Sequence, residues 1–290
     1  MSNYIICTDS TCDLPESYYK EHEIPVVSLS YTIRGETYPD NSTSKINKKE
    51  FYDMLRAGDM SSTSQINAED FIAIIEPLVK QGNDILFIAF SSALSGSYQS
   101  CQIGADELSE KYPQRKIIVI DSLCASMGEG LLLNYALQNQ KSGMSLDENA
   151  KWVEENKLKL CHWFTVDSLN HLHRMGRVSK ASAVLGGLIG IKPVLNVSDE
   201  GKLIFKAKVR GRPAAIKMLV EKMAQYAVNP KQQTIFISHG DCLDEAKLLA
   251  KMVRNKFGIK QDMIHYVGAV IGSHSGPGTL ALFFIGTERA

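Results

Sequence analysis

The residues best suited to binding chemistry lie in one segment near the C-terminus, Gly272-Ser273-His274-Ser275-Gly276-Pro277-Gly278. This segment surrounds a single imidazole with residues that leave the backbone bare and able to bend. A structural turn is one interpretation. A histidine among glycines has little core to pack into, so we expect His274 to bind a ligand, and the residue types indicate a small anion.

Two hydroxyl-rich clusters match this segment in character: Ser61-Ser62-Thr63-Ser64-Gln65 and Ser91-Ser92-Ala93-Leu94-Ser95-Gly96-Ser97-Tyr98. In parallel α/β sheets, ligands lie at the carboxyl ends of strands, where loops turn into helices and free N–H groups point outward. Thr63, Ser92 and Ser95 are therefore candidate anion ligands, unless their hydroxyls only cap helices. Arg174 and Arg177 can supply positive charge to the same cleft.

Several catalytic motifs are missing from the sequence. There is no Gly-x-Ser-x-Gly elbow, no phosphate-binding Gly-x-x-x-x-Gly-Lys-Ser/Thr loop, no Gly-x-Gly-x-x-Gly after a strand and no His-Glu-x-x-His. His171 and His173 lie in a segment expected to be helical, where positions two apart diverge. The sequence therefore predicts no metal site and no cofactor.

The composition is that of an ordinary globular protein, with 290 residues of which 44% are hydrophobic and 22% charged. The 32 basic residues balance 32 acidic ones, so no overall field attracts nucleic acid. Six scattered cysteines without a Cys-x-x-Cys pair indicate reduced thiols. Because we find neither a signal peptide nor a membrane-spanning apolar stretch, we expect a cytoplasmic protein.

Apolar runs alternate with segments of helical period, which predicts βαβ units. We expect an α/β fold of two domains. Residues 1–157 should form a mostly parallel sheet flanked by helices, with the hydroxyl-rich loops at the site. Residues 158–290 should form a mixed sheet with helices and carry the glycine-rich segment as a loop. Asn67 and Asp70 predict a helix that begins just after the Thr63 cluster, and residues 203–209 predict a half-exposed antiparallel strand.

Taken together, the motifs resemble the DegV family of bacterial fatty-acid-binding proteins, which includes the FakB subunits of fatty acid kinase. The resemblance covers essentially the whole chain. It runs through Thr8-Asp9-Ser10-Thr11-Cys12-Asp13-Leu14-Pro15, Thr63-Ser64-Gln65, Ser91-Ser92-Ala93-Leu94-Ser95-Gly96-Ser97-Tyr98-Gln99, Gly176-Arg177-Val178, Ile191-Lys192-Pro193 and the glycine-rich segment around His274.

The resemblance implies two α/β domains that bury one acyl chain and hold its carboxylate with hydroxyl groups. Carried over by motif, the carboxylate ligands fall on Thr63, Ser95 and His274, with Ser92 as the alternative serine. Arg174 is a further candidate, although Met175-Gly176-Arg177-Val178 differs from the Gly-Gly-Arg-Ile common in the family. A FakB-like member is a carrier that presents the acid to a separate ATP-dependent kinase for acyl-phosphate formation. Such a carrier has no catalytic activity alone, and its role allows transient contact with a membrane.

Elementary energetics agree with a carrier. Burying a chain of sixteen carbons at about 0.8 kcal/mol per methylene gives roughly 12 kcal/mol of gross driving force. An unpaired carboxylate would cost several kcal/mol, so donors are required at the cavity mouth. Two other functions remain open: an enzyme that uses His274 for phospho- or acyl transfer, and a regulatory module gated by a lipid.

Overall fold

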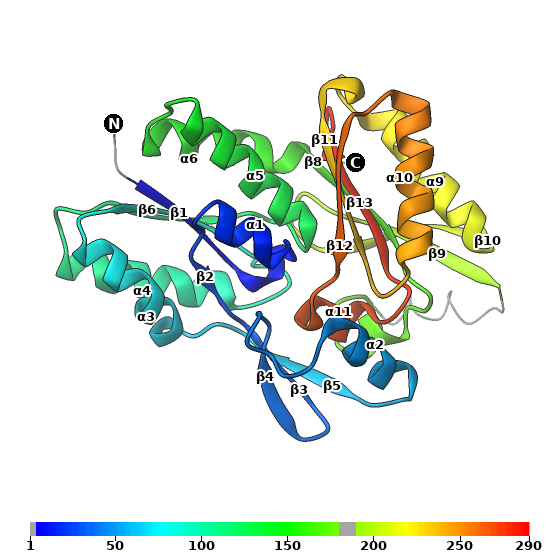
Figure 1. Cartoon of the computed structure of the whole chain (residues 1–290), viewed down its shortest axis with the longest axis horizontal. Helices are drawn as coiled ribbons and strands as arrows, with labels where there is room; N and C mark the ends of the chain where they lie inside the picture. The colour runs from blue at the N-terminus through cyan, green and yellow to red at the C-terminus, as the bar shows by residue number, and fades with distance from the viewer. Residues whose placement is uncertain (1–3, 180–189, 290) are drawn as a thin grey trace.

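The computed structural model describes residues 4–179 and 190–289. Over these residues the chain forms three β-sheets with helices packed against them (Figure 1). The strands before residue 122 make a four-stranded and a three-stranded sheet, and those after residue 159 make a six-stranded sheet. The strands of the two large sheets therefore separate between residues 122 and 159.

The four-stranded sheet is parallel throughout and has the order β2-β1-β6-β7. Its strands are β1 (Tyr4–Asp9), β2 (Val26–Val27), β6 (Asp84–Ala89) and β7 (Ile117–Asp121). One face packs on α3 (Ala68–Lys80) and α4 (Ser97–Lys111), the other on α1 (Glu16–Glu21), α5 (Met127–Lys141) and α6 (Leu146–Asn156). The predicted start of α3 is confirmed, because Asn67 and Asp70 form a reciprocal capping box.

The six-stranded sheet is mixed and has the order β10-β9-β8-β13-β11-β12. Only β11 and β12 pair in parallel. Its strands are β8 (Leu160–Thr165), β9 (Ile191–Val197), β10 (Leu203–Arg210), β11 (Thr234–His239), β12 (Gln261–Tyr266) and β13 (Leu280–Ile285). Helices α9 (Arg212–Tyr226) and α10 (Leu243–Phe257) cover one face. The prediction of a mixed sheet, with β10 half-exposed and antiparallel, is confirmed.

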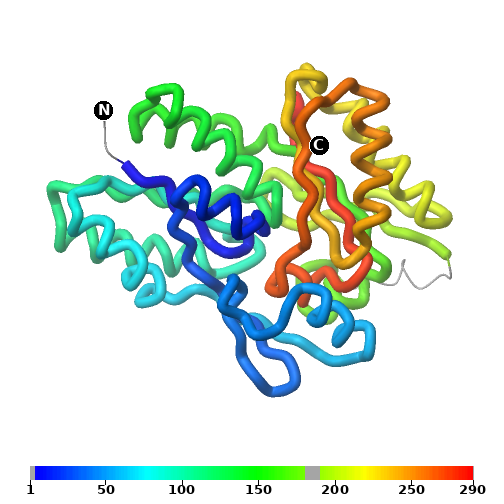
Figure 2. The backbone as a smooth tube through the Cα atoms, in the orientation of Figure 1, coloured from blue at the N-terminus to red at the C-terminus, as the bar shows by residue number. Residues whose placement is uncertain are grey.

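A small antiparallel sheet, β4-β3-β5, corrects the prediction for Thr63. Its strands are β3 (Ser30–Ile33), β4 (Glu36–Pro39) and β5 (Ser61–Ser64), and α2 (Lys48–Arg56) lies between β4 and β5 in the chain. Thr63 was expected in a loop before a helix, but it lies on β5 and pairs with Tyr31. Figure 2 shows this blue segment reaching from the first sheet to the orange segment near residue 270.

The glycine-rich segment also differs from the expected loop. Gly272 to Ser275 form the last part of α11 (Ala269–Ser275), and only the Gly-Pro-Gly that follows is a turn. Gly276 and Gly278 have φ of +79° and +76°, and a Cβ there would meet His171 and Asp167 respectively. Both glycines are therefore required for the sharp turn from α11 into β13.

The core joins the two halves of the sequence. Helix α5 packs against β1 and β6 of the parallel sheet and against β8, β11 and β13 of the mixed sheet. One cluster of buried side chains accordingly combines Leu86, Ile88 and Leu131 with Phe236 and Phe283. The six cysteines all lie within the described residues, where each is a free thiol. No helix within residues 4–179 and 190–289 is long and apolar enough to cross a membrane.

The remaining short elements complete the chain. They are α7 (Asn170–Arg174) and the 3-10 turns η1 (Ser10–Cys12), η2 (Lys157–Lys159) and η3 (Pro230–Gln232). Helix α7 contacts α11 and brings the segment after it, Met175 to Arg177, toward the end of β6.

Candidate functional site

A cavity of about 180 Å³ lies where β5, α11, the turn after β6 and the mixed sheet meet. It is slightly larger than the engineered cavity of about 150 Å³ that admits benzene. Most of its wall is apolar: Leu29, Phe90, Leu94, Phe164, Leu172, Val197, Leu203, Val267, Val270, Ile271, Ala281 and Phe283. A second, more open hollow adjoins it and shares Leu94, Arg177 and Leu203 with it. The wall suits a hydrocarbon group.

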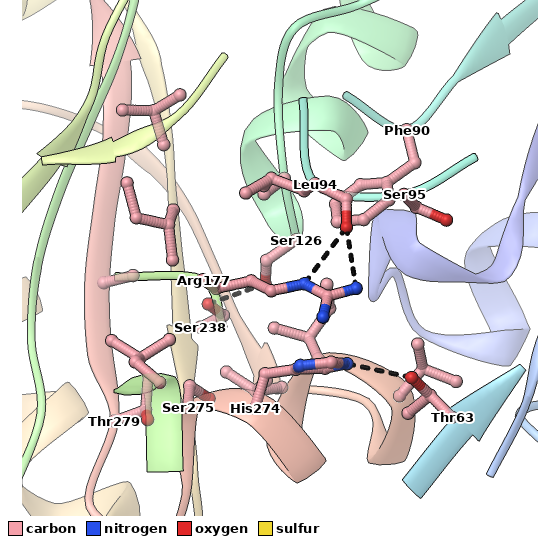
Figure 3. A pocket seen from close by; sticks show the side chains of 18 of the residues that line it. Thr63, Phe90, Leu94, Ser95, Ser126, Arg177, Ser238, His274, Ser275 and Thr279 are labelled. Atoms are coloured by element: carbon pink, nitrogen blue, oxygen red, sulfur yellow. Dashed lines mark hydrogen bonds between the residues drawn. The ribbon is translucent and has the colours of Figure 1, made fainter. Parts of the chain in front are cut away.

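Thr63 and His274 form the polar end of the cavity, where Thr63 Oγ1 lies 2.9 Å from His274 Nε2 (Figure 3). His274 Nδ1 is buried and has no partner in the described part of the chain. If Nε2 carries the proton, it donates to Thr63 and the hydroxyl proton stays free; if Nδ1 carries it, that N–H stays free. Either tautomer therefore leaves one donor available to a ligand.

Arg177 supplies the positive charge at this end. Its Nε and Nη2 donate to Leu94 O at 3.2 and 3.0 Å, and its Nη1 donates to Met175 O at 2.5 Å. These partners are neutral carbonyl groups, and no carboxylate of the described residues lies within ion-pair distance. Desolvation lowers the pKa of this half-buried guanidinium. An unpaired cation of this kind attracts an anion.

The electrostatics make His274 a neutral hydrogen-bonding group. Burial, and secondarily the charge of Arg177, lower the pKa of His274 to about 4. At neutral pH the imidazole is therefore uncharged. Arg177 is the one arginine among the described residues that line the cavity, and none of these residues is a lysine, aspartate or glutamate. The polar end thus carries one net positive charge.

Ser95 and Gly96 bring the start of α4 to the same end. Ser95 Oγ accepts from the backbone N–H of Ser97 at 3.2 Å, and Gly96 is the N-cap of this 15-residue helix without a side-chain cap. Helix N-termini favour negative charge because their first N–H groups point outward. Gln65 packs closely on Gly96, since a Cβ on Gly96 would lie 2.4 Å from Gln65 Oε1.

The structure gathers three of the five predicted site residues: Thr63, Ser95 and His274 line one cavity. Ser92 lies in the same turn as Ser95, but it is absent from the cavity wall, and its backbone N–H donates to Asp121 Oδ1 at 3.1 Å. Arg174 is exposed and also lies off the wall, with its Nη2 3.3 Å from His171 Nδ1. Whether these five residues bind a ligand stays a prediction.

Of the two arginines expected to supply positive charge to the cleft, Arg177 lines the cavity and Arg174 does not. Helix α7 ends at Arg174, and Gly176 then takes a φ of +73°, so the chain turns before Arg177. Sequence reasoning missed Ser126, Ser238 and Ser275, three buried serines of the cavity wall. Nothing in their spacing links them.

Comparison with known proteins gives one family along nearly the whole chain. The model of the DegV family, described as uncharacterised proteins, matches residues 4–287. A DegV domain-containing protein of Clostridium perfringens is 50% identical over 289 residues, which are 100% of this chain and 99% of that protein.

Two solved structures are similar over their full length. The first, described as showing fatty acid binding of a DegV family protein from Thermus thermophilus, has a TM-score of 0.87 at 27% identity and covers 98% of this chain and 99% of its own. The second is DegV, a fatty acid binding protein from Bacillus subtilis, with a TM-score of 0.83, 27% identity and coverage of 99% and 100%.

Proposed function

The chain belongs to the DegV family, and from this premise we propose that it binds a long-chain fatty acid. The carboxylate lies at the polar end of the cavity, between Arg177, the start of α4 and the Thr63–His274 pair. The acyl chain lies along the apolar wall. One observation carries the proposal: at one end of a mainly apolar cavity lie a guanidinium that has no carboxylate partner among the described residues and a neutral hydrogen-bond donor that is still available.

The energetics of this arrangement are favourable at both ends of the ligand. The acyl chain contributes about 0.8 kcal/mol for each methylene it buries, before the cost of ordering the chain. A carboxylate in the same cavity needs charge-assisted hydrogen bonds, and Arg177 retains N–H groups for them. Thr63 or His274 adds a neutral donor. Two similar proteins support this class of ligand, since those from Thermus thermophilus and Bacillus subtilis are described as fatty-acid binding.

We propose further that the protein is a carrier subunit that presents the acid to a separate ATP-dependent kinase in the cytoplasm. The exposure pattern supports this direction. Thr63, Ser95 and His274 are partly exposed, whereas Phe164 and Phe283 at the apolar wall are only 7% and 2% exposed. The carboxylate is thus the end of the ligand that a partner can reach, as formation of an acyl phosphate requires.

Native mass spectrometry of gently purified protein tests the ligand. We expect an added mass equal to one fatty acid, and uptake of a fatty acid after the protein has been stripped of lipid. Thr63→Val and Ser95→Ala should weaken binding of the acid relative to the alcohol of the same length. A stripped protein that takes up no acyl chain would refute the function.

The kinase step has its own test. The loaded protein, a fatty acid kinase catalytic subunit and ATP should together give acyl phosphate, which hydroxylamine traps as a hydroxamate. Either protein alone should give none. If this protein binds the acid but never supports hydroxamate formation, the carrier role fails while the ligand stands, and a lipid-gated regulatory role becomes the better explanation.

An enzyme that uses His274 is the second candidate, because a neutral buried imidazole can act as a base or nucleophile. The geometry favours it less. An orienting group normally holds the second ring nitrogen of a catalytic histidine, yet His274 Nδ1 has no partner within the described chain. Turnover of phosphate or acyl esters by this protein alone, lost in His274→Ala, would establish the enzyme instead.

A further inference from the structure

The inner wall of the cavity carries hydroxyl groups that the carboxylate site leaves unused. Ser126, Ser238 and Ser275 line the cavity and are 5%, 0% and 5% exposed. In Figure 3, Ser238 and Ser275 lie on the side of His274 away from Thr63. They come from different elements, Ser238 from β11 and Ser275 from the end of α11, while Ser126 precedes α5.

The three serines differ in whether their hydroxyl groups already form hydrogen bonds. Ser126 Oγ lies 2.5 Å from Asp13 Oδ2 and 3.0 Å from Ser238 Oγ, so these two hydroxyls form a chain that ends on a buried carboxyl group. Each still has a lone pair that can accept a further bond. Ser275 Oγ has no partner among the described residues although it is buried. It therefore offers one donor and two lone pairs to whatever occupies the cavity.

Other polar groups near these serines are already paired. His162 lies 3.0 Å from Leu160 O through Nδ1, and its Nε2 accepts from the N–H of Ala125 at 3.3 Å. Thr279 Oγ1 donates to Gly276 O at 2.8 Å. Among the described residues of the inner wall, the hydrogen-bonding groups that are still available therefore belong mainly to the three serines, and Ser275 alone of these three has a hydroxyl without any partner.

A cavity that held only hydrocarbon would be served better by alanine at position 275. Leaving a buried hydroxyl unpaired is destabilising, whereas alanine has no such cost and suits the helical backbone of α11. A ligand group that pairs with Ser275 removes the cost. Because Ser275 can donate and Ser126 and Ser238 can accept, the matching group both accepts and donates, as an alcohol does and a carbonyl group or a double bond does not.

We propose that this inner wall is a second hydrogen-bonding subsite for a hydroxyl group on the acyl chain. The protein then prefers hydroxylated fatty acids to unsubstituted ones of equal length. This inference rests on the proposed fatty-acid function, and it refines the ligand class of the same cavity.

Dissociation constants of the stripped full-length protein test the subsite. The ligands are stearic acid and a series of monohydroxystearic acids with the hydroxyl at different carbons. At least one isomer should bind about tenfold more tightly than stearic acid, which corresponds to one or two net hydrogen bonds. Ser275→Ala should remove most of this advantage and leave the affinity for stearic acid unchanged or slightly increased.

Two variants complete the design. Ser142→Ala changes an exposed serine at the end of α5 and should bind every acid as the unaltered protein does. Ser238→Ala serves if Ser275→Ala does not fold, and it should also reduce the preference. A protein that binds stearic acid but gains nothing from any hydroxyl position, or whose preference survives Ser275→Ala, refutes the subsite alone. Failure to bind any acid refutes the fatty-acid function and the subsite with it.

Discussion

Replacing Arg177 with methionine is the sharpest test of the carboxylate site. Methionine keeps much of the aliphatic length and removes the charge. Arg177 is the charged side chain of the described cavity wall, and within residues 4–179 and 190–289 its guanidinium donates to carbonyl groups alone. We therefore expect Arg177→Met to weaken binding of a fatty acid and to spare binding of the alcohol of the same chain length.

The size of the effect follows from the position of Arg177. Two unit charges about 4 Å apart interact by about 4 kcal/mol at an effective dielectric constant of 20. Arg177 is only half-buried, so solvent reduces this value, and hydrogen bonds to charged groups contribute about 1.5–3 kcal/mol. A loss of about 2 kcal/mol corresponds to a dissociation constant roughly 30-fold higher.

The assay is displacement of a fluorescent acyl probe, with Arg174→Met as the matched control. Arg174 is exposed and lies three residues away, outside the cavity wall, so its substitution should change neither ligand's affinity. The fatty alcohol detects any general damage caused by losing the bonds to Leu94 and Met175. Equal weakening of acid and alcohol, or an Arg174→Met effect as large as that of Arg177→Met, would refute the electrostatic role of Arg177.

Three further predictions concern stability in urea titrations. Because burial lowers the pKa of His274 to about 4, the unfolded chain binds a proton between pH about 6.5 and 4 that the folded chain does not bind. The free energy of unfolding should therefore fall as the pH falls through this range. His274→Asn should remove on the order of 2 kcal/mol of this fall. Burial, with the charge of Asp9, raises the pKa of Glu129, so above pH about 4.5 the unfolded chain releases a proton that the folded chain keeps. Glu129→Gln should therefore gain stability relative to the unaltered protein as the pH rises. Parallel curves of unfolding free energy against pH for the two proteins would contradict a protonated Glu129. Gly128→Ala would put a Cβ 2.1 Å from His162 Nε2, so we expect the free energy of unfolding to fall by more than about 1 kcal/mol. A smaller loss would show that His162 can move away.

The large sheets were predictable because their signals are local. β13 is an uninterrupted apolar run and β6 is one after its first residue, Asp84, and the start of α3 is marked by the residues that cap it. The three-stranded sheet has no such signal. β5 consists of Ser61, Ser62, Thr63 and Ser64, without one apolar side chain, and it is a strand because it pairs with β3. That pairing joins residues about thirty apart, which periodicity does not report.

The helical form of α11 had a similar non-local cause. Its one glycine and two serines lower its helix propensity, so the sequence favoured a loop. In the structure two buried carboxyl groups hold its first turn: Asp13 accepts from the N–H of Gly268, and Asp40 accepts from those of Ala269 and Val270. The sequence therefore identified His274 by its unusual neighbours but not the element that presents it.

Neither half of the chain contains the complete anion site that we propose. Thr63 and the start of α4 come from the first half, and Arg177 and His274 from the second. The hydrogen bond between Thr63 and His274 joins the halves directly, as do the bonds from Arg177 to Leu94. The shared core around α5 fixes the distance between them. If a fatty acid binds as we propose, its affinity depends on how closely the two halves pack, and opening them would expose the acyl chain and release the carboxylate in the same movement.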